Sequence, residues 1–326
     1  MNTTAFSFGP LGAKGFAFLN MIQLVGWTSI MIYDAMLALQ ELAPLSPMIW
    51  TIAIGALVIL WLFIGLHNTG YIQAIVSVLL LGLTLYMGVH MISQWPSDSS
   101  LMTNSNMSFI AALELSIAMP LSWLPLISDY TRESKSPFSA SLTSAAIYTV
   151  TSVAMYTLGL SAAIFGGGDS IITIMMNAGL GLAGLIVIIF STVTTTFMDA
   201  YSAGVSSTTI YNGASSKGVA VIVTIVGTIA AILYPMDDIT DFLYLIGSVF
   251  APMIAILLAD YFVNRQQVQT LSAYLVRGLI WAVSVGLYHY MLHSESSIGA
   301  TLPAFTIAFI VTSIVGFISK TANALL

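Results

Sequence analysis

Three carboxylates lie inside long apolar stretches of the sequence: Asp34, Glu114 and Asp199. An ionised side chain near the centre of a bilayer costs about 3 kcal/mol or more, so such residues tend to face a cavity, a partner or a transport path. Asp34 and Glu114 lie close enough to the ends of their stretches that reaching the membrane interface is the open alternative. Asp199 sits in a dense polar run and is the strongest candidate of the three.

A polar stripe containing one large aromatic ring runs along residues 16–39. At about 100° per residue, Asn20, Gln23, Trp27 and Asp34 fall within about 60° of one another, over about 21 Å of helix. Lipid gains nothing from amides and carboxylates, so the stripe should face the protein interior. It is either a ligand site with a flat aromatic wall or a set of hydrogen bonds to neighbouring helices.

Two further runs carry unusual residues for a membrane helix. Pro120 and Pro125 lie in one apolar stretch, where each removes a backbone donor, and we expect a kink or a break there. A broken helix at mid-membrane exposes backbone groups that can bind a substrate or an ion, whereas a simple kink does not.

The second run is rich in hydroxyls on one helical face about 120° wide: Thr192, Thr195, Thr196, Asp199 and Ser202. Hydroxyl and carboxylate oxygens are hard ligands for a cation, and the carboxylate also pairs with amino groups. The alternative for each hydroxyl is a bond to the carbonyl one turn back in its own helix. The stripe, the prolines and this run together favour a mid-membrane ligand site, as a transporter needs.

The composition indicates that the chain lies in a membrane. The chain has 326 residues, 58% hydrophobic and 6% charged, with mean hydropathy +0.97. About a quarter of an average soluble domain is charged, so the bilayer is the expected solvent. A net charge of −6 argues against nucleic acid as a partner, and the absence of Cys excludes disulfides and thiolate chemistry.

A membrane helix needs about 20 apolar residues, and the sequence offers ten such stretches. They form one transmembrane domain over residues 1–326, with no cleavable signal peptide at the start and no polar region that would hold a soluble domain. The predicted spans are 16–39, 47–66, 70–92, 107–128, 138–165, 174–201, 218–234, 241–263, 271–292 and 298–318.

With ten spans, all seven basic residues fall on one face: Lys14, Arg132, Lys135, Lys217, Arg265, Arg277 and Lys320. The other face carries only acids: Glu41, Asp98, Asp169, Asp237, Asp238, Asp241 and Glu295. Positive charge is retained on the cytoplasmic side. We therefore expect both termini in the cytoplasm of a cell with this protein in its inner (plasma) membrane.

Four ordered motifs resemble the nucleobase:cation symporter (purine/cytosine permease) family, and most closely its permeases for hydroxymethylpyrimidine, a thiamine precursor. The motifs are Gln23…Gly26-Trp27-Thr28, Ser122-Trp-Leu-Pro-Leu-Ile-Ser-Asp-Tyr-Thr-Arg132, Thr194-Thr-Thr-Phe-Met-Asp-Ala-Tyr-Ser-Ala-Gly204 and Ala259-Asp-Tyr-Phe262…Arg265. The resemblance implies an all-helical, leucine-transporter-like bundle with inverted repeats. Spans 16–39, 107–128, 174–201 and 241–263 match the family's third, sixth, eighth and tenth helices.

The resemblance also implies roles for individual residues. Trp27 falls on the tryptophan that stacks on the substrate ring, and Trp123 is a second possible wall. Gln23 substitutes for a hydrogen-bonding residue where this chain has Met31. Asp199 falls near a substrate-binding asparagine, and Asp199 and Glu114 would accept the amino N–H groups of the ring. The sodium-binding hydroxyl pair falls on Thr194 and Thr195, or in another register on Ser191 and Thr192.

Nothing in the chain matches the family's first two helices, which suggests an N-terminally shortened member. We expect a secondary transporter that imports a small aminopyrimidine such as hydroxymethylpyrimidine by alternating access, coupled to Na⁺ or H⁺ and needing no cofactor. Cytosine or purine transport is the alternative, and a nonfunctional remnant or scaffold is a reading of another class. An enzyme is disfavoured because no His or Cys lies beside a candidate nucleophile.

Overall fold

The computed structural model describes residues 1–42, 45–64, 69–93, 108–131, 134–165, 179, 181–265, 267–294 and 297–324. These residues contain ten helices long and apolar enough to cross a membrane, which confirms an all-helical membrane fold with about ten spans. In chain order they are α1 (Ala5–Leu42), α2 (Pro47–Ile64), α3 (Thr69–Ser93), α4 (Phe109–Thr131), α5 (Pro137–Phe165), α7 (Gly181–Ile210), α8 (Ser216–Leu233), α9 (Thr240–Leu258), α10 (Leu271–His293) and α11 (Thr301–Ala324).

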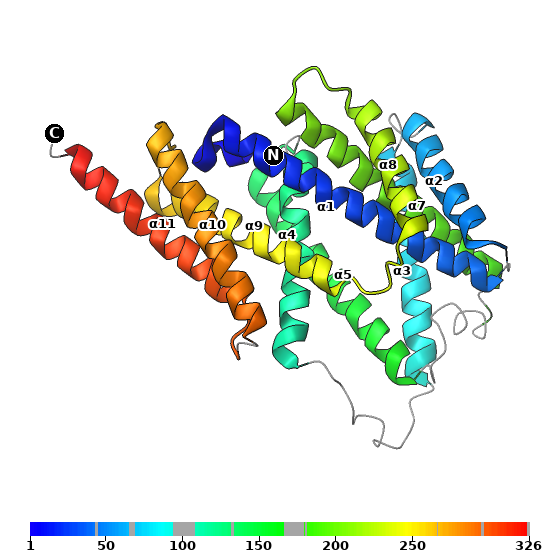
Figure 1. Ribbon diagram of the computed structural model, residues 1–326. Coiled ribbons are helices and arrows are strands. Elements are labelled where there is room, and N and C mark those ends of the chain that lie inside the picture. The colour runs from blue at the N-terminus through cyan, green and yellow to red at the C-terminus, as the bar shows by residue number, and fades with distance from the viewer. Residues whose placement is uncertain are drawn as a thin grey trace.

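Helix α1 is the centre of the arrangement. It packs along α7, α8 and α2, and each of these four helices gives one large side chain to a shared core: Leu24, Leu62, Phe197 and Val223. Figure 1 shows α2, α7 and α8 along one half of α1 and α10 and α11 toward its other end. A second core joins α9 and α11 to the start of α1.

The start of α1 lies outside the predicted span 16–39 and is bent. Gly9 has φ +68° and ψ −178°, so the helix changes direction there before Pro10. Gly9 also packs so closely on the Tyr274 ring that a Cβ would lie 2.7 Å from its carbons. The backbone N–H of Val268 donates to Phe6 at 3.2 Å. These contacts fasten the first turns of α1 to the segment that leads into α10.

One predicted helix end was wrong, and of the kink or break expected at the two prolines the structure excludes the break. The span predicted to stop at 201 continues to Ile210 as α7, because the hydroxyls of Ser207 and Thr208 bond carbonyls of their own helix and so do not compete with it. Helix α4 runs without a break through Pro120 and Pro125. The charged residues Asp98, Arg132, Asp169 and Glu295 lie outside the described residues.

Candidate functional site

Helices α1 and α7 form the largest interface, and two contacts fix how they lie side by side. Asn20 Nδ2 donates to Ser206 Oγ at 2.8 Å, and Thr196 Oγ1 lies 3.6 Å from Met31 Sδ. The helices are therefore antiparallel. Trp27 follows Asn20 by seven residues and Asp199 precedes Ser206 by seven, so the aromatic ring and the carboxylate lie at the same level. The two strongest candidates therefore lie at the same level of this interface, one on each helix.

Gln23 connects this interface to α4. Its Nε2 donates to Asn20 Oδ1 at 2.7 Å and to the Ser122 backbone carbonyl at 3.0 Å. Ser122 lies in the turn before Pro125, where the helix lacks one of its own N–H donors. Gln23 and Asn20 are both buried. The proline-containing helix therefore contributes to the site through a carbonyl rather than through a break.

Trp27 is half-buried and lies edge-on to Phe242 at the start of α9. The ring centroids are 5.4 Å apart and the ring planes meet at 73°. Gly26 allows this approach, because a Cβ there would lie 2.5 Å from the Phe242 ring. Neither the motif nor the periodicity singled out Phe242, which is 215 residues away in the sequence. It joins Trp27 as a second aromatic wall.

Buried polar atoms without hydrogen-bond partners occur on both α1 and α7. Within the described part of the chain, Gln23 Oε1, Trp27 Nε1, Thr28 Oγ1 and Asp199 Oδ2 are buried and make no hydrogen bond. Buried polar atoms are nearly always bonded, so each exception needs an explanation. Two acceptors and an indole donor beside an aromatic wall are the groups that a planar nitrogen heterocycle would satisfy.

Glu114 is placed elsewhere and has partners of its own, so its predicted role as a substrate ligand gains no support and stays a prediction. Its carboxylate accepts the backbone N–H groups of Ala300 and Thr301 at 3.0–3.1 Å, and the Thr301 hydroxyl donates to it at 2.5 Å. Gly299, with φ +77°, leaves the space that the carboxylate fills. Glu114 therefore caps the first turn of α11, where a helix favours negative charge, and three donors already occupy most of its acceptor sites.

Trp123 is also separated from the Trp27 site, so the structure does not support it as a second wall. With Met119 and Ile127 it faces α5 across a groove of about 570 Å³ that also contains Tyr148 and Ser152. The opposite face of α4, with Ser122 and Leu126, is the one that packs on α1 and α7. Successive residues on a helix point about 100° apart, which is why neighbours Ser122 and Trp123 have different environments.

The predicted cation ligands Thr192, Thr194 and Thr195 are on α7. The Thr194 hydroxyl bonds carbonyls of its own helix, whereas for Thr192 and Thr195 the structure gives only the burial of the side chain. Thr194 donates to the carbonyls of Phe190 and Ser191 at 2.9 and 3.0 Å, and Thr196 donates to Thr192 at 2.8 Å. This is the bonding within the helix that the sequence analysis left open. The Thr192 and Thr195 side chains are half-buried. The cation assignment for Thr192, Thr194 and Thr195 stays a prediction.

Asp34 does not belong to the site. It is exposed at the far end of α1, and its neighbour Tyr33 donates to Asp237 Oδ2 at 3.2 Å in the segment between α8 and α9. Its position agrees with the interfacial alternative. The buried polar part of the stripe therefore ends before Asp34, while apolar residues near the end of α1 such as Ala38 and Leu39 stay packed against other helices.

A fourth carboxylate inside a span was missed. Asp260 lies in a π-helical turn, η4 (Ala259–Asn264), and is fully buried against Arg277 of α10, with Nη2 to Oδ1 at 3.0 Å. Asn264 Nδ2 donates to the same Oδ1 at 2.8 Å and to the Thr312 carbonyl of α11 at 3.1 Å. The pairing of an acid in one span with a base in the next could have revealed it. Its partners make it a structural tie between three helices.

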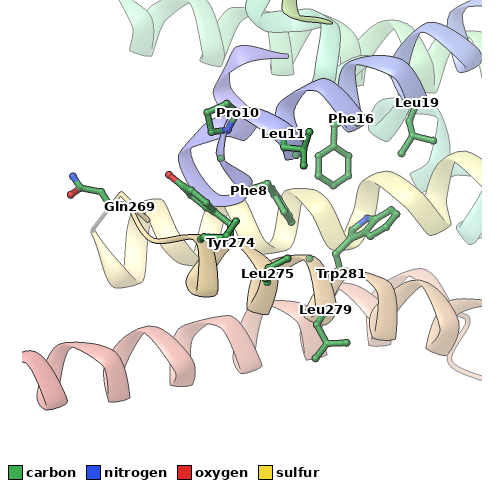
Figure 2. Close-up of a pocket in the computed structure, with 15 residues that line it drawn as sticks. Phe8, Pro10, Leu11, Phe16, Leu19, Gln269, Tyr274, Leu275, Leu279 and Trp281 are labelled. Carbon is green, nitrogen blue, oxygen red and sulfur yellow. The ribbon is translucent and has the colours of Figure 1, made fainter.

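Another hollow on the molecule is mostly apolar. Figure 2 shows a groove of about 920 Å³ between the bent start of α1 and α10, lined by rings such as Phe8, Phe16, Tyr274 and Trp281. It contains none of the predicted site residues. Among the described residues, no group of three or more His, Asp or Glu side chains is arranged to hold a metal ion.

Comparison with known proteins agrees with the fold. No protein-family model matches the sequence. The chain is 22% identical over 289 residues to the cytosine permease of Escherichia coli (strain K12), covering 86% of this chain and 68% of that protein, with the same values for the cytosine permease of Escherichia coli O157:H7. Among solved structures it is similar to Mhp1, a nucleobase-cation-symport-1 family transporter in a closed conformation with bromovinylhydantoin bound.

The similarity to Mhp1 has a TM-score of 0.73 at 16% identity and covers 98% of this chain and 79% of that one. It shows that the chain has the leucine-transporter-like fold predicted from its motifs. With ten apolar helices in that fold, the chain is a multi-pass integral membrane protein.

Proposed function

We propose that the protein is a cation-coupled transporter of the nucleobase:cation symporter family, and not an enzyme. The observation that carries the proposal is that Trp27 and Asp199 lie at the same level of the α1–α7 interface. Asp199 and Gln23 each have a buried acceptor atom there without a hydrogen-bond partner among the described residues. A planar ring stacks on an indole, and its N–H groups satisfy acceptors that otherwise cost about 1–3 kcal/mol each when left unbonded.

The substrate is an aminopyrimidine in this proposal. Cytosine is the first compound to test, because the curated relatives are cytosine permeases. Hydroxymethylpyrimidine, which the sequence motifs favour, carries the same amino-substituted ring and belongs in the same panel, together with a purine. Coupling to Na⁺ or H⁺ would use oxygens of α7, including those of Thr192, Thr194 and Thr195.

The test is uptake of labelled base by the purified chain in liposomes, with an inward Na⁺ gradient or an inward H⁺ gradient imposed separately. We expect uptake with one gradient and a loss of at least tenfold in Trp27→Ala and Asp199→Ala. Asp34→Asn, which lies outside the site, is the matched control. Uptake unchanged in both site variants would refute the site, and no binding or uptake of any base by the wild type would refute the function.

Orientation in the inner membrane, with both termini in the cytoplasm, is part of the proposal. The chain has no Cys, so single introduced cysteines report sidedness without a background. Ser134 lies between α4 and α5 and Asp238 between α8 and α9, and both are exposed. An impermeant maleimide applied to intact cells should label Asp238→Cys and not Ser134→Cys. The reverse pattern would contradict the orientation.

A further inference from the structure

The orientation of the Gln23 amide is fixed by its surroundings. A backbone carbonyl only accepts hydrogen bonds, so the end of Gln23 that lies 3.0 Å from the Ser122 carbonyl must be the NH₂ end. The second hydrogen of that group points to Asn20, so the atom of Asn20 that meets it must be Oδ1. The NH₂ group of Asn20 then faces Ser206. One carbonyl therefore sets the polarity of two amides.

The hydrogen-bonded series from the Ser122 carbonyl through Gln23 and Asn20 to Ser206, called the relay below, leaves only the oxygen of Gln23 for a ligand. Nε2 has two hydrogens and both are used, whereas Oε1 is buried and makes no hydrogen bond with the described residues. Asp199 Oδ2, level with Trp27, is in the same condition. Asn20, Gln23 and Ser206 are each at most 3% exposed, so water does not readily replace any link of the relay. Gln23 therefore offers a ligand only an acceptor for as long as Asn20 occupies the second hydrogen of its NH₂ group.

Resting on the proposed function, we infer that Asn20 is a positioning residue: through Gln23 it makes the site select heterocycles that present N–H donors over rings that present a carbonyl at the same edge. Cytosine and uracil differ in this respect, because cytosine has an amino group where uracil has an oxygen. A carbonyl placed against Gln23 Oε1 would pair two acceptors. Without Asn20, one hydrogen of Gln23 Nε2 loses its acceptor and can donate to a ring carbonyl, while the other hydrogen still bonds the Ser122 carbonyl, so the site accepts either ring.

The competing explanation is that the relay only joins α1, α4 and α7. Such a structural role lowers stability and weakens every ligand by the same factor, whereas a positioning role changes the ratio of affinities. The experiment therefore measures the Kd of the purified full chain for cytosine and for uracil, together with the thermal midpoint of each variant.

In the wild type we expect cytosine to bind at least tenfold more tightly than uracil, the effect of about one hydrogen bond. Asn20→Leu should bring the ratio close to one. Asn20→Asp keeps an acceptor for Gln23 Nε2 and should retain the preference. Ser29→Ala is the control, since Ser29 is buried on the same helix and donates to the Val25 carbonyl of that helix at 2.8 Å. Asn20→Ala is the second variant where leucine prevents folding.

Equal binding of the two bases by the wild type would overturn the inference and leave the proposed function standing. A common loss for both bases in Asn20→Leu and Asn20→Ala, with the ratio unchanged, would also overturn it. Failure of the wild type to bind any base would refute the proposed function itself, so the two failures are distinguishable.

Discussion

Replacing Glu114 by glutamine tests whether this buried acid is a helix cap or a substrate ligand. The two predictions differ in what should change. A cap holds the first turn of α11 against α4, so its loss lowers stability and leaves ligand affinity intact. A substrate ligand would show the opposite pattern, with a loss of affinity and little change in the free energy of unfolding.

The expected size of the effect follows from the contacts of the carboxylate. It accepts from three donors, the N–H groups of Ala300 and Thr301 and the Thr301 hydroxyl. Hydrogen bonds to charged groups are worth about 1.5–3 kcal/mol each. Glutamine keeps one oxygen but turns an NH₂ group toward N–H donors, so we expect a loss of about 2 kcal/mol. Alanine leaves all three donors without the carboxylate and should cost about 4 kcal/mol.

Thermal unfolding in detergent, followed by tryptophan fluorescence, measures the loss. At about 2 °C per kcal/mol for a chain of this size, Glu114→Gln should lower Tm by about 4 °C, and Thr301→Val, which removes one hydroxyl, by about 2 °C. The double variant should lose less than the sum, since the two groups contact each other. An unchanged Tm combined with a tenfold weaker Kd for the base would refute the capping argument.

Three further predictions concern the rest of the fold. Gly299→Ala should destabilise, because its φ is +77° and its Cβ would overlap the Glu114 carboxylate; Gly278→Ala, with nothing within 4 Å, should be neutral or slightly stabilising in the same Tm assay. Asp260→Asn or Arg277→Met alone should cost about 3–5 kcal/mol, and the two together less than either, since a lone buried charge is worse than none; additive losses in chemical unfolding would contradict this. Hydrogen bonds from Thr240 hold the pKa of the Asp238 carboxyl below its ordinary value of 3.8. The small contribution of Asp238 to stability is therefore present above pH 3.8 and is lost as the pH falls further. Asp238→Asn should flatten that part of the Tm-against-pH curve, and an unchanged slope would argue against the bond.

The positions of the helices could be predicted because the bilayer sets a minimum length for each apolar run. The errors came where local sequence imitates an ending or a break. The predicted span stops before Ser207, yet the Ser207 hydroxyl bonds a carbonyl of its own helix and α7 continues to Ile210. Pro120 and Pro125 remove backbone donors without breaking α4, and Gln23 donates a hydrogen bond to the Ser122 carbonyl in the turn before Pro125.

The candidate site could be predicted from the sequence where its residues share one helix face. It could not be predicted where the contact partner of a residue is far away in the sequence. Gln23 and Trp27 follow from periodicity along α1. Glu114 looked equally promising as an isolated acid, but its role depends on Thr301, 187 residues away. Phe242 reaches Trp27 from another helix and carries no signal of its own in the sequence. Composition and spacing describe one helix, whereas such pairings depend on how two helices cross.

The length of α1 has a consequence for the membrane around it. From Pro10 to Leu42 the helix spans about 50 Å, whereas the hydrocarbon core is about 30 Å thick. A helix of that length must cross at a slant or project into the headgroups, and a thinner bilayer increases the slant. Gln23 and Trp27 lie on this helix, whereas Asp199 lies on α7. A change in the acyl-chain length of the lipids would therefore change the tilt of α1 and, with it, how Gln23 and Trp27 are placed relative to Asp199.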